Sequence, residues 1–146
     1  VAITALAFGM TWGLGTVLML FYNGIVLGAI SVDYVRDGQT QFLLGWLMPH
    51  GVIEIPAILV AAQAGFVLAA ALIGWGQRAR MRERLREVSP DVVTLCVGFA
   101  LMLVWAGFVE AFLSQYHEPV IPYDAKIAFG AVEAGLLCLY LAKSGR

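Results

Sequence analysis

Three glutamates stand in stretches of this chain that otherwise carry almost no charge. Glu54, Glu110 and Glu133 each lie inside an apolar run, and His50 precedes Glu54 by about one helical turn. An ionised carboxylate at the centre of a bilayer is costly, so each group must be protonated, hydrogen-bonded, metal-bound or hydrated. These four residues therefore form the candidate polar site.

A divalent cation such as zinc is one occupant that this set predicts. At about 100° per residue, His50 and Glu54 share one face of a helix, and zinc accepts both imidazole and carboxylate ligands. The predicted ligands are His50, Glu54, Glu110 and His117. Two other interpretations stay open: a structural network in which Glu54 bonds to the backbone amides near Pro49, and a path for a proton or solute.

Motifs of common enzymes are missing from the sequence. The stretch from His50 to Glu54 is not the H-E-x-x-H of a zinc protease, and the glycines from Gly13 to Thr16 lack the lysine of a phosphate loop. The chain also has no G-x-S-x-G motif. We therefore expect a protein without enzymatic activity.

Composition places these groups in a membrane. Of 146 residues, 61% are hydrophobic and 13% charged, against about 45–50% and about 25% in soluble domains. This composition excludes a disordered chain, two cysteines exclude a disulfide scaffold, and a net charge of −1 argues against nucleic-acid binding. The prediction is an all-α integral membrane protein.

Runs without charge predict about four transmembrane helices in a single bundle over residues 1–146. The predicted spans are 2–32, 42–76, 92–113 and 125–142. The second, as one straight helix, would be about 52 Å long, whereas the hydrocarbon core is about 30 Å thick. We therefore expect a break or a re-entrant segment near Pro49-His50-Gly51, because proline removes a backbone donor and glycine frees the chain.

Basic residues alternate between the loops. Five arginines lie in the loop 77–91 and two basic residues near the C-terminus, against Arg36 alone in the first loop. By the positive-inside rule, the 77–91 loop and the C-terminus are cytoplasmic. The expected location is the cytoplasmic membrane of a bacterium or archaeon.

Small residues recur at helical spacing along the spans, where they let helices approach closely in lipid. The predicted helix-packing positions are Ala57, Ala61, Gly65, Gly24, Gly28 and Gly130. This pattern favours a compact bundle and a homo-oligomer. The expected partners are the lipid bilayer and other membrane or envelope proteins, with no nucleic acid.

One block of the sequence resembles a known family. Pro49-His50-Gly51, followed by Glu54 and a helix rich in small residues, is similar to the hallmark of the stage II sporulation protein M family. Supporting similarities are Asn23-Gly24 with Gly28, Glu110-Ala111-Phe112, and Lys126 with Gly130. The resemblance covers most of the chain.

The resemblance implies a polytopic membrane protein without an established enzymatic activity. In endospore formers the named member works with peptidoglycan-degrading partners during engulfment, while most relatives occur in organisms that do not sporulate. Family members carry a cytosolic N-terminal segment, so one is expected before Val1. The expected function is a scaffold or assembly component of a cell-envelope complex. Translocation of a cation or small solute and a metal-dependent membrane hydrolase are the alternatives.

Overall fold

The computed structural model describes residues 1–116 and 119–144, and this part of the chain is helical without strands. Its elements are α1 (Ala2–Ala7), the 3₁₀ helix η1 (Phe8–Thr11), α2 (Leu14–Arg36), α3 (Thr40–Ile73), α4 (Met81–Val109), the π-helical turn η2 (Glu110–Ser114) and α5 (Tyr123–Lys143). Four helices are long and apolar enough to cross a membrane: α2, α3, α4 with η2, and α5. The prediction of an all-α membrane protein with four spans is confirmed.

The first predicted span, 2–32, is divided in two. A sharp turn separates the short α1–η1 segment from α2, with positive φ angles of 54° at Trp12 and 81° at Gly13. Gly13 adopts this left-handed conformation without steric cost, whereas Trp12 is one of the few side-chain-bearing residues that do so. The span itself therefore begins at Leu14.

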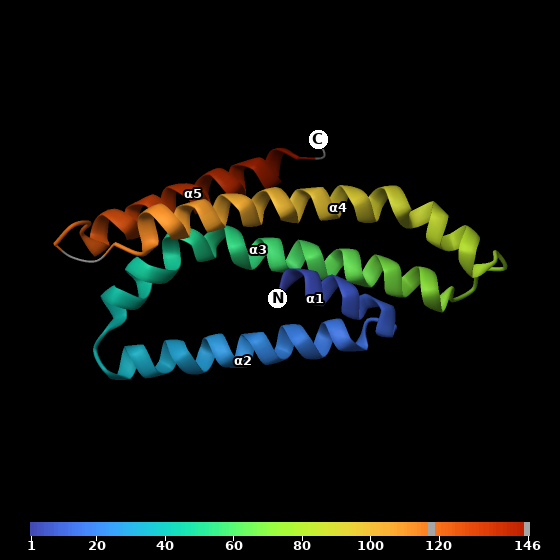
Figure 1. The fold of residues 1–146 in the computed structure, drawn as a ribbon, viewed down its shortest axis with the longest axis horizontal. Helices are drawn as coiled ribbons and strands as arrows, with labels where there is room; N and C mark the ends of the chain where they lie inside the picture. The colour runs from blue at the N-terminus through green and yellow to red at the C-terminus, as the bar shows by residue number, and fades with distance from the viewer. Residues whose placement is uncertain (117–118, 145–146) are drawn as a thin grey trace. The chain divides into compact units, whose positions relative to one another are not determined.

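The predicted break at Pro49-His50-Gly51 is wrong, because α3 continues through both Pro49 and Pro56. Figure 1 shows α3 bending in its first turns instead of ending there. A proline inside a helix costs one hydrogen bond and causes a kink. A full break within lipid would leave several backbone groups unsatisfied, so the kinked helix is the cheaper solution.

The predicted loop 77–91 is shorter than expected, since α4 already begins at Met81. The carboxylate Oε2 of Glu83 accepts a hydrogen bond from the Arg80 backbone N–H at 3.2 Å, which caps the start of this helix. Alternating arginine and glutamate are good helix formers, so the polar stretch extends the apolar helix. The fourth span, predicted at 125–142, agrees with α5 within two residues.

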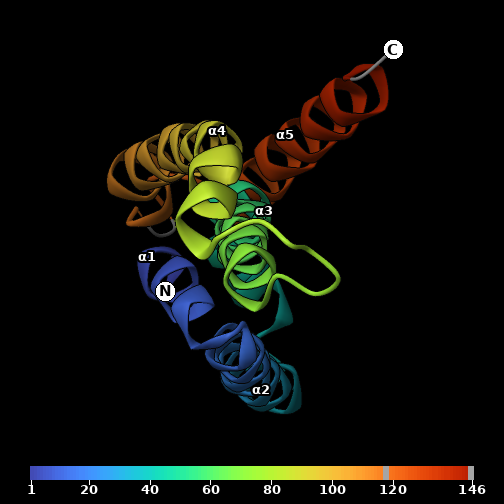
Figure 2. The same cartoon turned by 90° about the vertical axis from the view of Figure 1, so that its right-hand side faces the viewer.

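The chain divides into two compact units by its contacts: unit 1 is Val1–Leu27 with Ala57–Leu101, and unit 2 is Gly28–Pro56 with Met102–Arg146. In unit 1 the second half of α3 lies beside α1, as Figures 1 and 2 show. A Cβ atom built on Gly9 would overlap the backbone of Gly65, so the two backbones are in direct contact. The predicted packing positions Ala57, Ala61 and Gly65 are all buried here.

Unit 2 joins the first turns of α3 to the first turns of α5. The rings of Phe42 and Tyr123 meet edge to face at 5.8 Å. Two turns further along α5, a Cβ atom on Gly130 would lie 2.7 Å from the carbonyl oxygen of Met48, so Gly130 permits close contact between the helices. The beginnings of α3 and α5 therefore lie at the same end of this unit.

Two of the predicted packing positions make no close helix contact among the described residues. Gly24 and Gly28 on α2 are exposed, and no atom of the described residues lies within 4 Å of a Cβ built on either. Only 6% of the most apolar stretch of α2 is buried, against 39% for α3. The small-residue face of α2 is therefore open within this chain.

Candidate functional site

A buried hydrogen bond links α3 to the end of α4 in unit 2. His50 Nδ1 and Ser114 Oγ lie 3.0 Å apart, and the two side chains are only 5% and 1% exposed. The ring of Trp46, one turn before His50 on α3, contacts the imidazole edge to face at 5.9 Å. Of the predicted site residues, His50 is thus fixed by packing and by one polar partner.

Ser114 and Glu110 stand at the two ends of the π-helical turn η2, in different surroundings. Both residues lie in η2, and it is the Ser114 hydroxyl that bonds to His50. Ser114 is buried, whereas Glu110 at the start of the same turn is exposed.

Lys126, in the first turn of α5, lies in the same network. Its ammonium group Nζ donates to the backbone carbonyl of Ser114 at 3.0 Å and to that of Tyr116, and it lies 5.8 Å from the centre of the Tyr123 ring. The Lys126 side chain is only 1% exposed. Lys126 satisfies carbonyls that the end of the preceding helix leaves without partners.

The pairing of a serine with a histidine raises the question of nucleophilic catalysis. Such a serine must face a space that a substrate can enter. Ser114 is only 1% exposed and His50 only 5%, so both side chains are shielded from solvent. The His50–Ser114–Lys126 network therefore has the properties of a structural clamp that holds three helical segments together.

Glu133, at the middle of α5, belongs to a second polar contact. The indole Nε1 of Trp105 on α4 donates to Glu133 Oε1 at 2.6 Å. The other carboxyl oxygen, Oε2, is buried and has no hydrogen-bond partner in the described structure. Glu133 is 7% exposed, so this oxygen is shielded from solvent without being satisfied.

A groove of about 400 Å³ opens beside this carboxyl group. It is lined by Ile53, Trp105, Phe129, Val132, Glu133, Leu136, Leu137 and Tyr140. All of these residues belong to unit 2, and Glu133 is the only ionisable carboxyl group among them.

The other predicted site residues differ in their surroundings. Glu54 is half-buried and Glu110 exposed. Within residues 1–116 and 119–144, no three His, Cys, Asp or Glu side chains are grouped so that they could hold a metal ion. His117, the fourth predicted ligand, lies outside the described residues.

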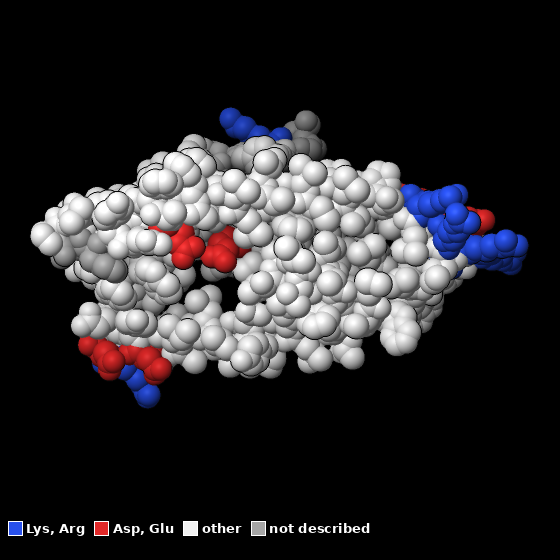
Figure 3. Space-filling model, in the orientation of Figure 1, with Lys and Arg blue, Asp and Glu red and all other residues white. Residues whose placement is uncertain are grey.

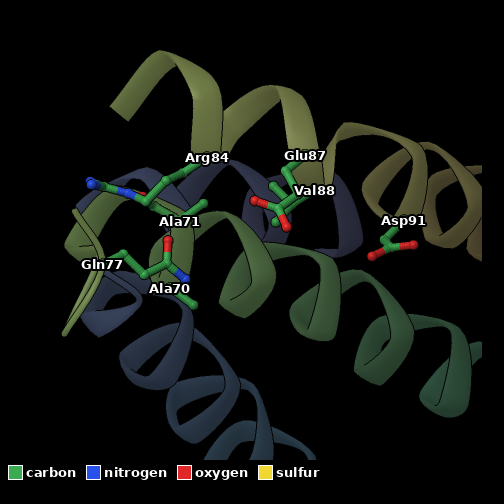
Figure 4. Close-up of a pocket in the computed structure, with 7 residues that line it drawn as sticks. All are labelled: Ala70, Ala71, Gln77, Arg84, Glu87, Val88 and Asp91. Atoms are coloured by element: carbon green, nitrogen blue, oxygen red, sulfur yellow. The ribbon is translucent and has the colours of Figure 1, made fainter. Parts of the chain in front are cut away.

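One of the five loop arginines has a structural role. Arg84 donates from Nε to the carbonyl of Ala71 at 2.8 Å, and from its two terminal nitrogens to those of Leu72 at 3.2 Å and Ala79 at 2.7 Å. Figure 4 shows its guanidinium group at the end of α3, beside a hollow of about 220 Å³ along which Glu87 and Asp91 follow on α4. The last carbonyls of α3 are thereby satisfied.

The remaining arginines of this loop, at positions 78, 80, 82 and 86, are exposed. Figure 3 shows Lys and Arg side chains gathered at the α3–α4 turn, and acidic side chains within a surface that is otherwise uncharged. The free arginines retain the charge pattern on which the predicted orientation rests.

Sequence reasoning missed Ser114 and Trp105 as polar partners. A serine near a helix end and a tryptophan in an apolar span are common, so neither residue type marks a site by itself. Lys126 did carry a signal, because a lysine inside the first turn of a span needs a carbonyl or carboxylate partner.

Helices of this length and hydropathy, with polar groups that bond to one another inside the chain, define a polytopic integral membrane protein. The family described as Stage II sporulation protein M has a model that matches residues 1–115. The chain therefore belongs to the stage II sporulation protein M family, which confirms the resemblance seen in the Pro49-His50-Gly51 block.

A relative supports this assignment. An uncharacterised protein of Methanocaldococcus jannaschii is 26% identical over 113 residues, which cover 75% of this chain and 62% of the relative. The chain thus spans less than two thirds of the length of that curated relative. No solved structure matches the chain.

Proposed function

We propose that this protein is a non-enzymatic scaffold of the cell membrane that assembles envelope proteins through lateral helix contacts. The observation that carries this proposal is the open face of α2. Gly24 and Gly28 are spaced one turn apart, as in small-residue motifs that bring membrane helices together, and neither has a neighbour within 4 Å of its Cβ position. A second copy of this chain or a membrane helix of an envelope protein would complete this contact.

The internal polar network supports the same function. His50, Ser114 and Lys126 bond to one another or to backbone groups, so they stabilise a fixed helix arrangement. Buried hydrogen bonds that are satisfied make a structure rigid, as a platform for partner proteins requires.

The orientation that we propose places the 77–91 loop and the C-terminus in the cytoplasm. The four exposed arginines of this loop support it, since positive loops remain on the cytoplasmic side. In a variant without Cys96 and Cys138, a cysteine introduced by Arg82→Cys should react with a membrane-impermeant maleimide only after the membrane is opened. Labelling in intact cells would show the opposite orientation.

The scaffold proposal is tested by extracting the protein from native membranes in lipid nanodiscs after chemical cross-linking. We expect complexes larger than one copy, which the double substitution Gly24→Leu and Gly28→Leu reduces at least fivefold. The matched control is Gly135→Leu, an exposed glycine of α5 that also lacks a neighbour within 4 Å. A protein that is monomeric and without partner, or a complex that the double variant leaves intact, would contradict the proposal.

A further inference from the structure

The groove beside Glu133 combines an apolar lining with one unsatisfied polar atom. Glu133 Oε1 accepts the Trp105 indole hydrogen, while Oε2 is buried without a partner. Buried polar atoms are rarely left in this state, and each exception calls for a physical explanation. Glu133 lines the groove, so a rotation of its carboxyl group would bring Oε2 to a bound molecule that supplies the missing partner.

The depth of Glu133 restricts the chemistry of such a molecule. It lies ten residues from each end of α5, at the middle of a helix about 32 Å long. A helix of this length spans the hydrocarbon core, which is about 30 Å thick, so its middle residue belongs to the bilayer interior, away from the polar surfaces. The ester and headgroup atoms of glycerolipids remain near those surfaces, and the ligand must therefore bring its polar atom into the bilayer interior.

The protonation state of Glu133 determines what the polar atom of the ligand must be. An isolated carboxylate at this depth would be very costly, so the acid is neutral and Oε2 carries the proton. A neutral acid that already accepts from Trp105 lacks only an acceptor for its own hydrogen. A carbonyl oxygen supplies that acceptor, whereas an amine would take the proton and place two charges in hydrocarbon.

We propose that this groove binds a membrane-dissolved quinone, whose ring carbonyl accepts the Glu133 hydrogen and whose apolar body fills the groove. Quinones with isoprenoid tails have two carbonyl acceptors, carry no donor in the oxidised form and dissolve in the bilayer interior. The volume of about 400 Å³ lies within the range of small-molecule sites. Trp105 and Phe129 offer aromatic faces against which a planar ring packs.

Fluorescence of Trp105 gives a direct measurement of binding. In a variant whose other tryptophans are replaced (Trp12→Phe, Trp46→Phe and Trp75→Phe), Trp105 is the only indole and lies on the groove. The protein is placed in quinone-free lipid nanodiscs and titrated with decylubiquinone. We expect quenching that saturates at about one quinone per protein.

Substitutions of Glu133 identify the bond. Glu133→Met removes the donor and keeps the volume, so the apparent affinity should fall at least tenfold. Glu133→Gln keeps a donor amide at the same place and should bind within about threefold of the parent. Glu110→Met is the matched control, because Glu110 is exposed and does not line the groove, and it should bind like the parent.

Each other outcome overturns the proposal. Equal titration curves for the parent and a folded Glu133→Met variant would show that the carboxyl group does not bind the quinone. Saturable binding of dodecylamine that is lost in Glu133→Gln would show a cation site instead. A membrane helix cross-linked to the groove in native membranes, with no prenyl quinone in the organic extract of the purified protein, would show that a protein fills it. The nanodisc titration needs no protein partner, so its result does not depend on the scaffold proposal.

Discussion

Different kinds of contact hold the helices together within each of the two units. In unit 1, helices meet through backbone contact, with Gly9 against Gly65 and the Thr16 hydroxyl donating to the Ala5 carbonyl at 2.8 Å. In unit 2, buried side chains with polar groups connect the helices, through His50, Ser114 and Lys126. Membrane helices gain little from the hydrophobic effect when they associate, so close packing and internal hydrogen bonds must replace it.

The two kinds of helix contact tolerate different substitutions. Backbone contact needs small residues and relies on few polar side chains; in unit 1 the Thr16 hydroxyl is one, bonded to Ala5. A buried polar network requires that every member keep its partner, because an orphaned group in a medium of low polarity is costly. A larger side chain at a helix contact should therefore destabilise unit 1 most. The loss of a hydrogen bond should destabilise unit 2 most.

The largest effect should follow from Gly9→Ala in unit 1. The new methyl group would overlap the backbone of Gly65, which no side-chain rotation can relieve. We expect the free energy of unfolding to fall by about 3 kcal/mol or more, measured by thermal or denaturant unfolding in detergent micelles. Gly98→Ala in α4 is the control: its Cβ meets nothing within 4 Å, and it should be neutral or stabilising by about 0.5–1 kcal/mol. Equal stability of the two variants would contradict the backbone contact.

A smaller but still large effect is expected for Lys126→Met in unit 2. Methionine keeps most of the volume but leaves the carbonyls of Ser114 and Tyr116 without their donor. The expected loss of stability is about 2–3 kcal/mol. Lys143→Met, at the exposed end of α5, should change stability by no more than about 0.5 kcal/mol. If both lysine variants unfold alike, the polar network does not hold unit 2 together.

The smallest effect should come from Ser114→Ala. It removes one neutral hydrogen bond and leaves His50 Nδ1 buried, so about 1–2 kcal/mol of stability should be lost. Ser89→Ala, an exposed serine of α4, serves as the control and should have almost no effect. A further loss when Ser114→Ala is added to Lys126→Met, smaller than in the parent, would show that the two contacts act as one network.

Much of the fold was predictable because lipid leaves few alternatives. Long charge-free runs must become helices, so α2, α3, α4 and α5 follow from hydropathy alone. The turn at Trp12 and Gly13 was not predictable, because nothing in an apolar run of 32 residues tells a long helix from a short helix followed by another. The continuity of α3 through Pro49 was also missed, since proline predicts a kink and a break equally well.

The site was predictable only in part. His50 and Glu133 were identified because ionisable groups in apolar spans need partners. Their partners were not identified: Ser114 reaches His50 through a π-helical turn that sequence spacing does not reveal, and Trp105 is 28 residues away from Glu133. Glu54 and Glu110 gave the same sequence signal as Glu133, yet only Glu133 is buried.

The contact of Arg84 with the end of α3 has a consequence for biosynthesis. It joins residues only 12 and 13 positions apart, so it can form as soon as this short stretch has left the ribosome. Loops of about ten residues close within about 10–100 ns, far faster than residues are added during translation at about 5–20 per second. The α3–α4 turn should therefore form early, and α3 and α4 would meet α5 as a preformed hairpin rather than as free segments.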